Sequence, residues 1–299
     1  MSSIIVVVSV DWEGSSLFAE NIKSIRTFRE RHPYVPIQQF LNAAYYSQME
    51  EADEIITDKI NSVLLPSDGH GLHLHAWMSL QQRAGVDIRN SPLFCDETLL
   101  AEDGISDVGY AVPMESFSVD ELSLMIKDSV GLLTDQGFKR PTCFRAGGWQ
   151  AGSNVFEALT ANDFKLDASG ANTQIVTKVA NASLGQKLLK LWPMITDESQ
   201  PYVMNTANGE LWELPNNGSL ADFITAEEML VIFNNNVDRW KVSPDKPVFF
   251  SIGFHQETAS LFLDRISQVV TEIQEIADRE NIPIIFTAEP LKYMTGFNS

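Results

Sequence analysis

The sequence predicts an α/β fold, and within that class a parallel (β/α) barrel. Short runs rich in Val, Ile and Phe alternate with amphipathic stretches almost from end to end. Several of these runs show little polar alternation, which is typical of strands covered on both faces. The chain has 299 residues, and a typical barrel of this kind has ~250. A doubly wound open sheet is the alternative, although no Gly-x-Gly-x-x-Gly follows the first apolar run.

Eight runs are expected to be strands, and three amphipathic stretches are expected to be long helices. The strands are residues 4–10, 37–40, 71–75, 142–145, 164–168, 211–214, 247–254 and 282–287. The helices are residues 118–135, 225–240 and 259–279, which carry apolar residues at helical spacing. Ser118 precedes the first helix as a cap, and Thr225 opens a capping-box pattern before the second.

We expect a single domain over residues 1–299, because no linker, charge block or internal repeat divides the chain. Residues 86–113 and 172–208 are weakly patterned and are expected to be long loops or insertions. The first apolar run has no basic region before it and is too short to span a membrane. No targeting segment or membrane insertion is therefore expected.

The charge balance narrows the classes of partner. The 40 acidic and 21 basic side chains give a formal net charge of -19, which argues against nucleic acid and anionic membranes as partners. Neutral or cationic substrates suit such a surface better. The 2 cysteines cannot build a disulfide framework, so we expect a reducing compartment, the cytoplasm.

Ionisable residues stand at the carboxyl ends of five of the expected strands. Barrel active sites form at that end, from several strands at once. The joint occurrence of these residues is therefore a stronger signal than any one of them alone. In chain order they are Asp11 and Glu13, His73 and His75, Arg145, Asp167, and His255.

Their spacing points to a metal site. Residues i and i+2 of a strand face the same side, so His73 and His75 project together, and so do Asp11 and Glu13. Two imidazoles and a carboxylate, with a position left for water, make a typical Zn²⁺ site. The alternative is that the histidines are hydrogen-bonded core residues. His70 is an odd number of residues from His73 and so faces the opposite side of the strand. We expect it to lie in a loop or to contact the metal ligands without binding the metal.

Taken in order, these motifs resemble the five motifs of the polysaccharide deacetylases, the NodB-homology or carbohydrate esterase family 4 group. They are Ser-Val-Asp11-Trp-Glu13-Gly, Gly-His-Gly-Leu-His73-Leu-His75, Phe-Arg145-Ala-Gly-Gly-Trp149, Leu-Asp167-Ala-Ser and Gly-Phe-His255-Gln-Glu-Thr. The resemblance covers most of the chain. It implies a distorted (β/α) barrel of the polysaccharide deacetylase type, often seven-stranded, and metal-dependent hydrolysis of acetyl groups on glycans.

Carried over position by position, the resemblance implies catalytic roles for four residues. Asp11 matches the catalytic base, and Arg145 matches the arginine that orients this base. His255 matches the general acid of the last motif. Asp167 matches the acid that tunes the catalytic histidine.

The metal motifs depart from the family pattern in two places. The family usually has adjacent aspartates, whereas here one residue separates the two acids, and Glu13 becomes the metal carboxylate. His73 matches the first metal histidine, but Trp77 stands where the second usually is. We therefore assign the second histidine to His75, which shares the strand face of His73. The expected cofactor is a divalent metal, with Zn²⁺ as the first choice.

Three tryptophans lie beside the motif strands: Trp77, Trp149 and Trp212. They are expected to bind substrate, because indole rings can stack on sugar faces. The alternative is that they pack in the barrel rim.

The sequence thus predicts a metal-dependent amide hydrolase that removes an N-acetyl or similar acyl group from a glycan, such as an O-antigen or capsule intermediate. In this scheme the metal activates water, Asp11 takes the water proton, and His255 protonates the leaving amine. Two alternatives stay open. One is hydrolysis of a small amide such as a ureide on the same barrel, and the other is a catalytically silent glycan-binding protein.

Overall fold

The protein folds as one curved, mainly parallel sheet with helices outside it, which confirms the predicted α/β class. The computed structural model describes residues 2–48, 51–95, 97, 100, 104–179 and 182–294. The sheet has the strand order β6-β7-β5-β4-β3-β2-β1-β8, and β9 pairs with β1. The strands are β1 (Ile4–Asp11), β2 (Ile37–Leu41), β3 (Gly69–Leu74), β4 (Cys143–Ala146), β5 (Leu166–Asp167), β6 (Tyr202–Thr206), β7 (Gly209–Glu213), β8 (Val248–His255) and β9 (Ile284–Phe286).

Parallel pairing joins β1, β2, β3, β4, β5, β7 and β8 into a distorted barrel. Residues 216–221, which follow β7, close the ring against β8 at the carboxyl end. Gly253 N–H donates to Ser219 O at 3.1 Å, and Ala221 N–H donates to Gly253 O at 2.8 Å. On the other side, Asn216 N–H donates to Gly170 O at 2.8 Å. The barrel expected from the resemblance is therefore present.

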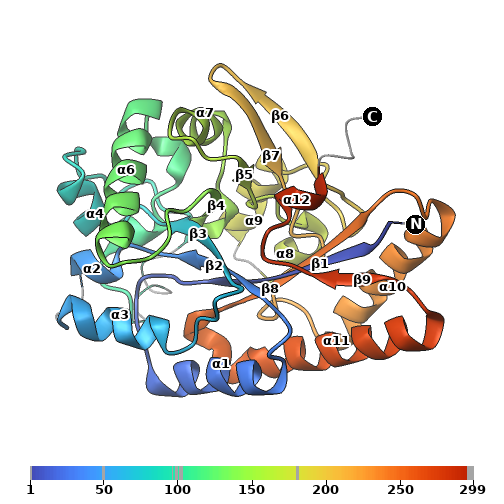
Figure 1. Cartoon of the computed structure of the whole chain (residues 1–299). Helices are drawn as coiled ribbons and strands as arrows, with labels where there is room; N and C mark the ends of the chain where they lie inside the picture. Colours follow the sequence, from blue (N-terminus) through green and yellow to red (C-terminus); the bar gives the residue numbers. More distant parts are fainter. Residues whose placement is uncertain are drawn as a thin grey trace.

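All eight expected strands form, with small changes at their ends, but the sequence did not indicate β6. β6 pairs antiparallel with β7 at the edge of the sheet, within the segment 172–208 that was expected to be a loop or insertion. Its residues are exposed or only half-buried. An edge strand of this kind needs no apolar run, so the pattern that marks buried strands is absent. The hairpin of β6 and β7 projects from the rest of the fold (Figure 1).

The long helices begin where their capping residues predict. Ser118 caps α6 and Thr225 caps α10, each in a capping box with the acidic residue three positions on. The helices are α1 (Ala19–Arg31), α2 (Tyr45–Gln48), α3 (Asp53–Asn61), α4 (Met78–Arg83), α6 (Val119–Asp135), α7 (Ser153–Ala161), α8 (Thr173–Val179), α9 (Ala182–Leu191), α10 (Ala226–Val242), α11 (Ala259–Glu280) and α12 (Leu291–Met294). Short 3₁₀ turns are η1 (Val108–Ala111), η2 (Met114–Ser116), η3 (Gly147–Trp149) and η4 (Gln256–Thr258).

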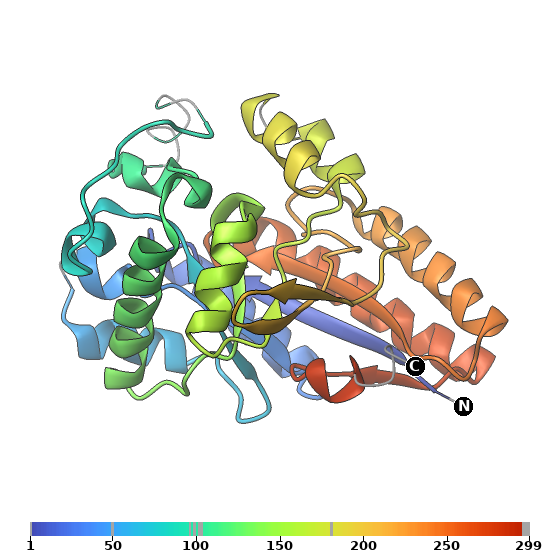
Figure 2. The same ribbon diagram turned by 90° about the horizontal axis from the view of Figure 1, so that it is seen from above.

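Strand alternation separates two apolar layers. On β1, Val6 and Val8 join the large core between the sheet and the helices, whereas Ile5 and Val7 join a smaller cluster inside the barrel. β1 and β8 lie side by side although they are far apart in the sequence, with α11 along one side (Figure 1 and Figure 2). Ile5, Val7 and Phe249 of this cluster fill the amino-terminal part of the barrel, and the polar residues of the motifs stand at the carboxyl end.

Among the described residues, no helix combines the length and apolar character that crossing a bilayer requires.

Candidate metal and catalytic site

Strand alternation places two histidines of the third motif inside the barrel. Leu72 and Leu74 belong to the layer under the helices, so His73 and His75 have the inward parity. His70 has the outward parity, and its ring centre lies 6.2 Å from that of Phe138. His70 is therefore outside the candidate metal site.

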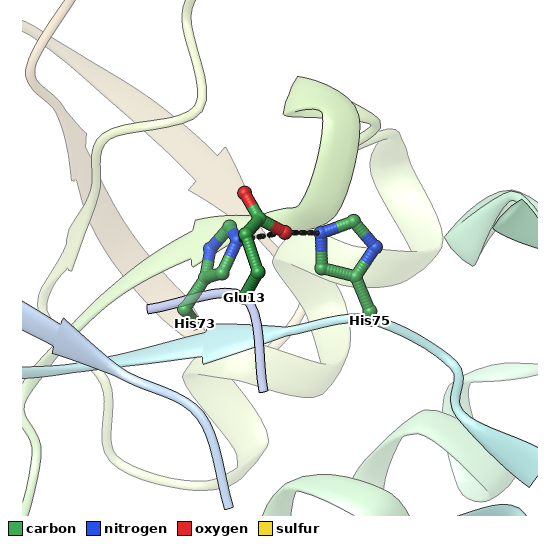
Figure 3. Close-up of side chains that lie close together, drawn as sticks. All are labelled: Glu13, His73 and His75. Carbon is green, nitrogen blue, oxygen red and sulfur yellow. Dashed lines mark ion pairs between the residues drawn. The ribbon is translucent and has the colours of Figure 1, made fainter. Parts of the chain in front are cut away.

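Glu13 follows β1 and directs its carboxylate at both imidazoles (Figure 3). Its Oε2 lies 2.7 Å from His75 Nε2 and 3.5 Å from His73 Nε2. All three residues are buried, and one ligand atom of each lies within 4.8 Å of the others. The structure thus brings together the three predicted metal ligands.

The other ring nitrogens show which atoms are free to bind a cation. His73 Nδ1 lies 3.0 Å from Arg145 O, and His75 Nδ1 lies 2.8 Å from Tyr110 O. A carbonyl oxygen can only accept, so each Nδ1 carries the proton and each Nε2 of the neutral ring presents a lone pair. While the rings are neutral, both buried Nε2 atoms lack a hydrogen-bond donor, and both face the Glu13 carboxylate. Either a cation or protonation must stabilise this arrangement, so these residues fit a divalent metal.

The electrostatics of Glu13 support the same conclusion. Burial raises the pKa of Glu13, but the charges of His75 and His73 outweigh burial and lower the pKa well below its usual value. Burial works against protonation of His73, and the Glu13 carboxylate overcomes this effect and raises the pKa of His73. The carboxylate is therefore ionised in a place that attracts positive charge.

Asp11 and Arg145 form a buried ion pair at the same end of the barrel. Arg145 Nη1 lies 2.7 Å from Asp11 Oδ1 and donates to Ser9 Oγ at 2.9 Å. Arg145 Nε donates to Ala168 O at 2.9 Å, and the guanidinium carbon lies 4.4 Å from the ring centre of Phe40. The expected contact between Asp11 and Arg145 is present, and the guanidinium is held from several strands.

His255 lies between two carboxylates at the end of β8. Its Nε2 is 3.2 Å from Glu13 Oε1, and its Nδ1 is 3.1 Å from Asp222 Oδ2. Asp222 also accepts the backbone N–H of His255 and the hydroxyl of Thr258. Burial works against protonation, but the carboxylates of Asp222 and Glu13 raise the pKa of His255 to about 10. The imidazole is therefore a proton donor near neutral pH.

Asp167 does not tune His255, and this expectation from the resemblance is corrected by the structure. Leu166 and Ala168 join the cluster inside the barrel, so Asp167 between them has the outward parity. Its register partner is Glu213 on β7, and the two carboxyl groups interact directly.

The charge of Arg145 lowers the pKa of both outward carboxyl groups, but this effect is smaller than that of burial. Burial raises the pKa of Asp167 to about 6. Burial and the charge of Asp167 raise the pKa of Glu213 well above its usual value. Asp167 Oδ2 and Glu213 Oε2 find no other hydrogen-bond partner, so a shared proton holds the pair together. This pair links β5 to β7 on the face of the sheet opposite the metal ligands.

Trp77 and Trp149 do not present open faces to a sugar, whereas Trp212 is half-buried. Trp77 is 2% exposed, and its indole N–H donates to Glu13 O at 3.1 Å. Trp149 is 5% exposed, and its ring centre lies 5.3 Å from that of Phe223. Trp212 packs beside the apolar cluster in the barrel interior. Stacking on a sugar requires an accessible ring face, so the expectation for Trp77 and Trp149 does not fit this structure.

Three residues of the site were not singled out in the sequence. Asp222 and Tyr110 lie in irregular segments, where no periodicity marks them. Glu257 lies two residues after His255 in the last motif, and its carboxylate accepts the backbone N–H of Glu13 at 3.2 Å. Burial and the charge of Glu13 raise the pKa of Glu257 to about 7. The only sequence signal for Glu257 is its place in the motif Gly-Phe-His255-Gln-Glu-Thr, because β8 ends at His255 and strand alternation does not continue into η4. Asp222 required the fold.

Comparison with solved structures shows which known fold this chain resembles. No family model matches the sequence, and a search of curated proteins found no match. A solved structure described as a polysaccharide deacetylase from Mycobacterium smegmatis is similar, with a TM-score of 0.57 at 9% identity over 98% of this chain and 89% of that chain. A structure described as a polysaccharide deacetylase from Pseudomonas aeruginosa PAO1 gives a TM-score of 0.50 at 13% identity, covering 98% of this chain and 90% of that one.

A third solved structure, Puue allantoinase, gives a TM-score of 0.54 at 13% identity over 99% of this chain and 90% of that chain. Sequence identities this low establish a shared architecture and leave the substrate open. The chain therefore has the distorted barrel fold of the polysaccharide deacetylases, as a highly divergent example of it.

Proposed function

We propose that this protein is a metal-dependent amide hydrolase that removes an N-acetyl or similar acyl group from a glycan, with Zn²⁺ as its metal. The observation that carries the proposal is the pair of buried Nε2 atoms on His73 and His75, both directed at the Glu13 carboxylate. One carboxylate and two imidazoles leave a position for water or substrate, as catalytic zinc sites do. The fold shared with polysaccharide deacetylases supports the choice of reaction.

A divalent metal held by Glu13, His73 and His75 would lower the pKa of bound water toward ~7 and polarise the acyl oxygen. In the proposed reaction Asp11, held by Arg145, takes the proton of the attacking water. Asp11 and His255 are register partners on neighbouring strands.

His255 then protonates the nitrogen that leaves, because an amine is a poor leaving group until it is protonated. Asp222 keeps His255 in its protonated form. An ionised carboxylate as base and an imidazolium as acid, each fixed by a neighbour of opposite charge, suit the two proton transfers.

The test is acetate release from N-acetylated sugar oligomers by the purified protein, with and without a chelator, and with a ureide as a competing substrate. Acetate release that the chelator abolishes and Zn²⁺ restores is the expected result. Ureide hydrolysis without acetate release would contradict the glycan assignment in favour of a small-amide hydrolase. Glycan binding without turnover would show a silent binding protein.

The biological glycan stays a prediction, as do the cytoplasmic compartment and a place in O-antigen or capsule assembly. The net charge of -19 favours a substrate without phosphate and does not repel an amine product.

A further inference from the structure

Tyr110 contacts two of the three candidate metal ligands, from a segment whose sequence showed no regular pattern. Its phenol O–H donates to Glu13 Oε2 at 3.0 Å. Its backbone oxygen accepts the Nδ1 proton of His75 at 2.8 Å. Its ring lies face to face on the His75 imidazole, with 3.9 Å between ring centres and 7° between planes. One residue thus contacts a carboxylate oxygen and constrains both the tautomer and the ring plane of a histidine.

Tyr110 is itself held in place by the residues just before it. The Asp107 carboxylate caps η1 by accepting the N–H of Gly109 at 2.9 Å, and it also accepts the N–H of Met78 at 3.1 Å. A Cβ at Gly109 would lie 2.5 Å from Ala76 O and 2.6 Å from Met78 N. Only glycine therefore lets η1 lie directly against the chain that follows His75, and this close approach fixes where Tyr110 sits.

We propose that Tyr110 is a positioning residue of the metal site. This inference rests on the proposed function, because it requires the metal that the proposed function names. The phenol directs Glu13 Oε2, and the ring and carbonyl oxygen of Tyr110 hold the His75 Nε2 lone pair toward the same point. The ligands are then arranged before the metal binds. Groups that orient metal ligands in this way are worth 10–100-fold in metal affinity.

The test is Tyr110→Phe, which removes only the hydroxyl and keeps the ring and the backbone oxygen. We expect the dissociation constants for Zn²⁺ and Co²⁺ to rise ~10-fold or more, and the visible absorption of the Co²⁺ form to change. The melting temperature of the metal-free variant is expected to stay at the wild-type value. Tyr110→Ala also removes the stacked ring, so its loss of affinity is expected to be larger.

Tyr46→Phe is the matched control. It removes a tyrosine hydroxyl that hydrogen-bonds with Thr57 at 3.0 Å, outside the site, and it is expected to leave metal affinity unchanged. Equal affinity and an identical Co²⁺ spectrum for Tyr110→Phe and wild type would overturn the proposal. An equal loss of affinity in both variants would overturn it too, because the effect would then follow from general loosening of the fold.

These measurements need no substrate, so they separate this proposal from the proposed function. A wild-type protein that binds Zn²⁺ but releases no acetate contradicts the hydrolysis, and the affinity of Tyr110→Phe still decides the role of Tyr110. A wild-type protein that binds no divalent metal overturns the positioning role.

Discussion

Two groups of buried carboxyl side chains lie on opposite faces of the same sheet, and they differ in what surrounds them. At the barrel mouth, Glu13 faces three imidazoles, and His75 and His73 lower its pKa despite burial. On the outer face, Glu213 faces Asp167, and burial together with that like charge raises its pKa. The first group is arranged to hold positive charge, whereas the second is arranged to hold one proton. Buried acids therefore indicate a reactive site only when their neighbours are known.

Loss of a metal ligand at the barrel mouth is expected to have the largest effect. His75→Ala should abolish stoichiometric zinc and lower acetate release by about four orders of magnitude, because the metal contributes several kcal/mol to the reaction. Metal analysis and an acetate assay measure both effects. The control is His70→Ala on the same strand, which has the outward parity. Full metal content in His75→Ala would show that the ligand assignment is wrong.

Neutralising the proposed base is expected to have the next largest effect. Asp11→Asn should lower kcat for acetate release about 1000-fold, within the range that a general base contributes. Its zinc content should remain stoichiometric, because Asp11 pairs with Arg145 and is not among the proposed ligands. Activity within tenfold of wild type would exclude Asp11 as the base.

Asp222 is expected to act through the pKa of His255. Asp222 is the main group that raises this pKa to about 10, so Asp222→Asn should lower it and move the basic limb of the pH–rate profile to lower pH. We also expect kcat to fall about 10-fold to 100-fold, since the imidazole loses its anchor.

Asp167→Asn tests the assignment made from the sequence resemblance. Because Asp167 lies on the other face of the sheet, its replacement should leave the basic limb where wild type has it. A shift with Asp167→Asn and none with Asp222→Asn would show that Asp167, and not Asp222, sets the pKa of His255.

The carboxyl pair on the outer face is expected to affect stability rather than catalysis. Both pKa values are raised above those of the unfolded chain, so the pair stabilises the fold at low pH. This contribution is lost as the pH rises through about 6, the pKa of Asp167, and further as Glu213 ionises.

Glu213→Gln replaces the ionising group with an amide that can donate to Asp167. Its melting temperature relative to wild type should therefore increase by a few degrees between about pH 5 and pH 8. Thermal melts at both pH values measure this change. Glu210→Gln, at an exposed position of the same strand, should show no such trend. A constant difference between Glu213→Gln and wild type would mean that the pair does not titrate in this range.

Much of the site was predictable because parallel strands bring their carboxyl ends to one place. The i and i+2 spacing of His73 and His75, and the position of Glu13 just after β1, were enough to predict the metal group. Leu166 and Ala168 are apolar and face the barrel interior, so the same parity argument places Asp167 on the other face of the sheet. Residue type at a strand end was a misleading signal there.

Asp222 and Tyr110 could not be predicted, because their positions depend on loops. Asp222 reaches His255 since residues 216–221 pair with β8 and close the barrel. Tyr110 reaches Glu13 since Asp107 and Gly109 fix η1 against α4. Neither contact follows from periodicity, which describes only elements that bury one face.

By itself the sequence determined every strand except β6, the three longest helices and the alternation that turns His73 and His75 toward the same side, because apolar spacing and capping act locally. The tertiary structure decided which acid partners each ionisable residue. Asp222 and not Asp167 contacts His255. Tyr110 contacts the ligands Glu13 and His75 from a segment with no apolar periodicity. The physical reason is that a hydrogen bond or close ion pair forms only when the two atoms lie within about 4 Å of each other. The partner of each residue is therefore set by how distant loops pack.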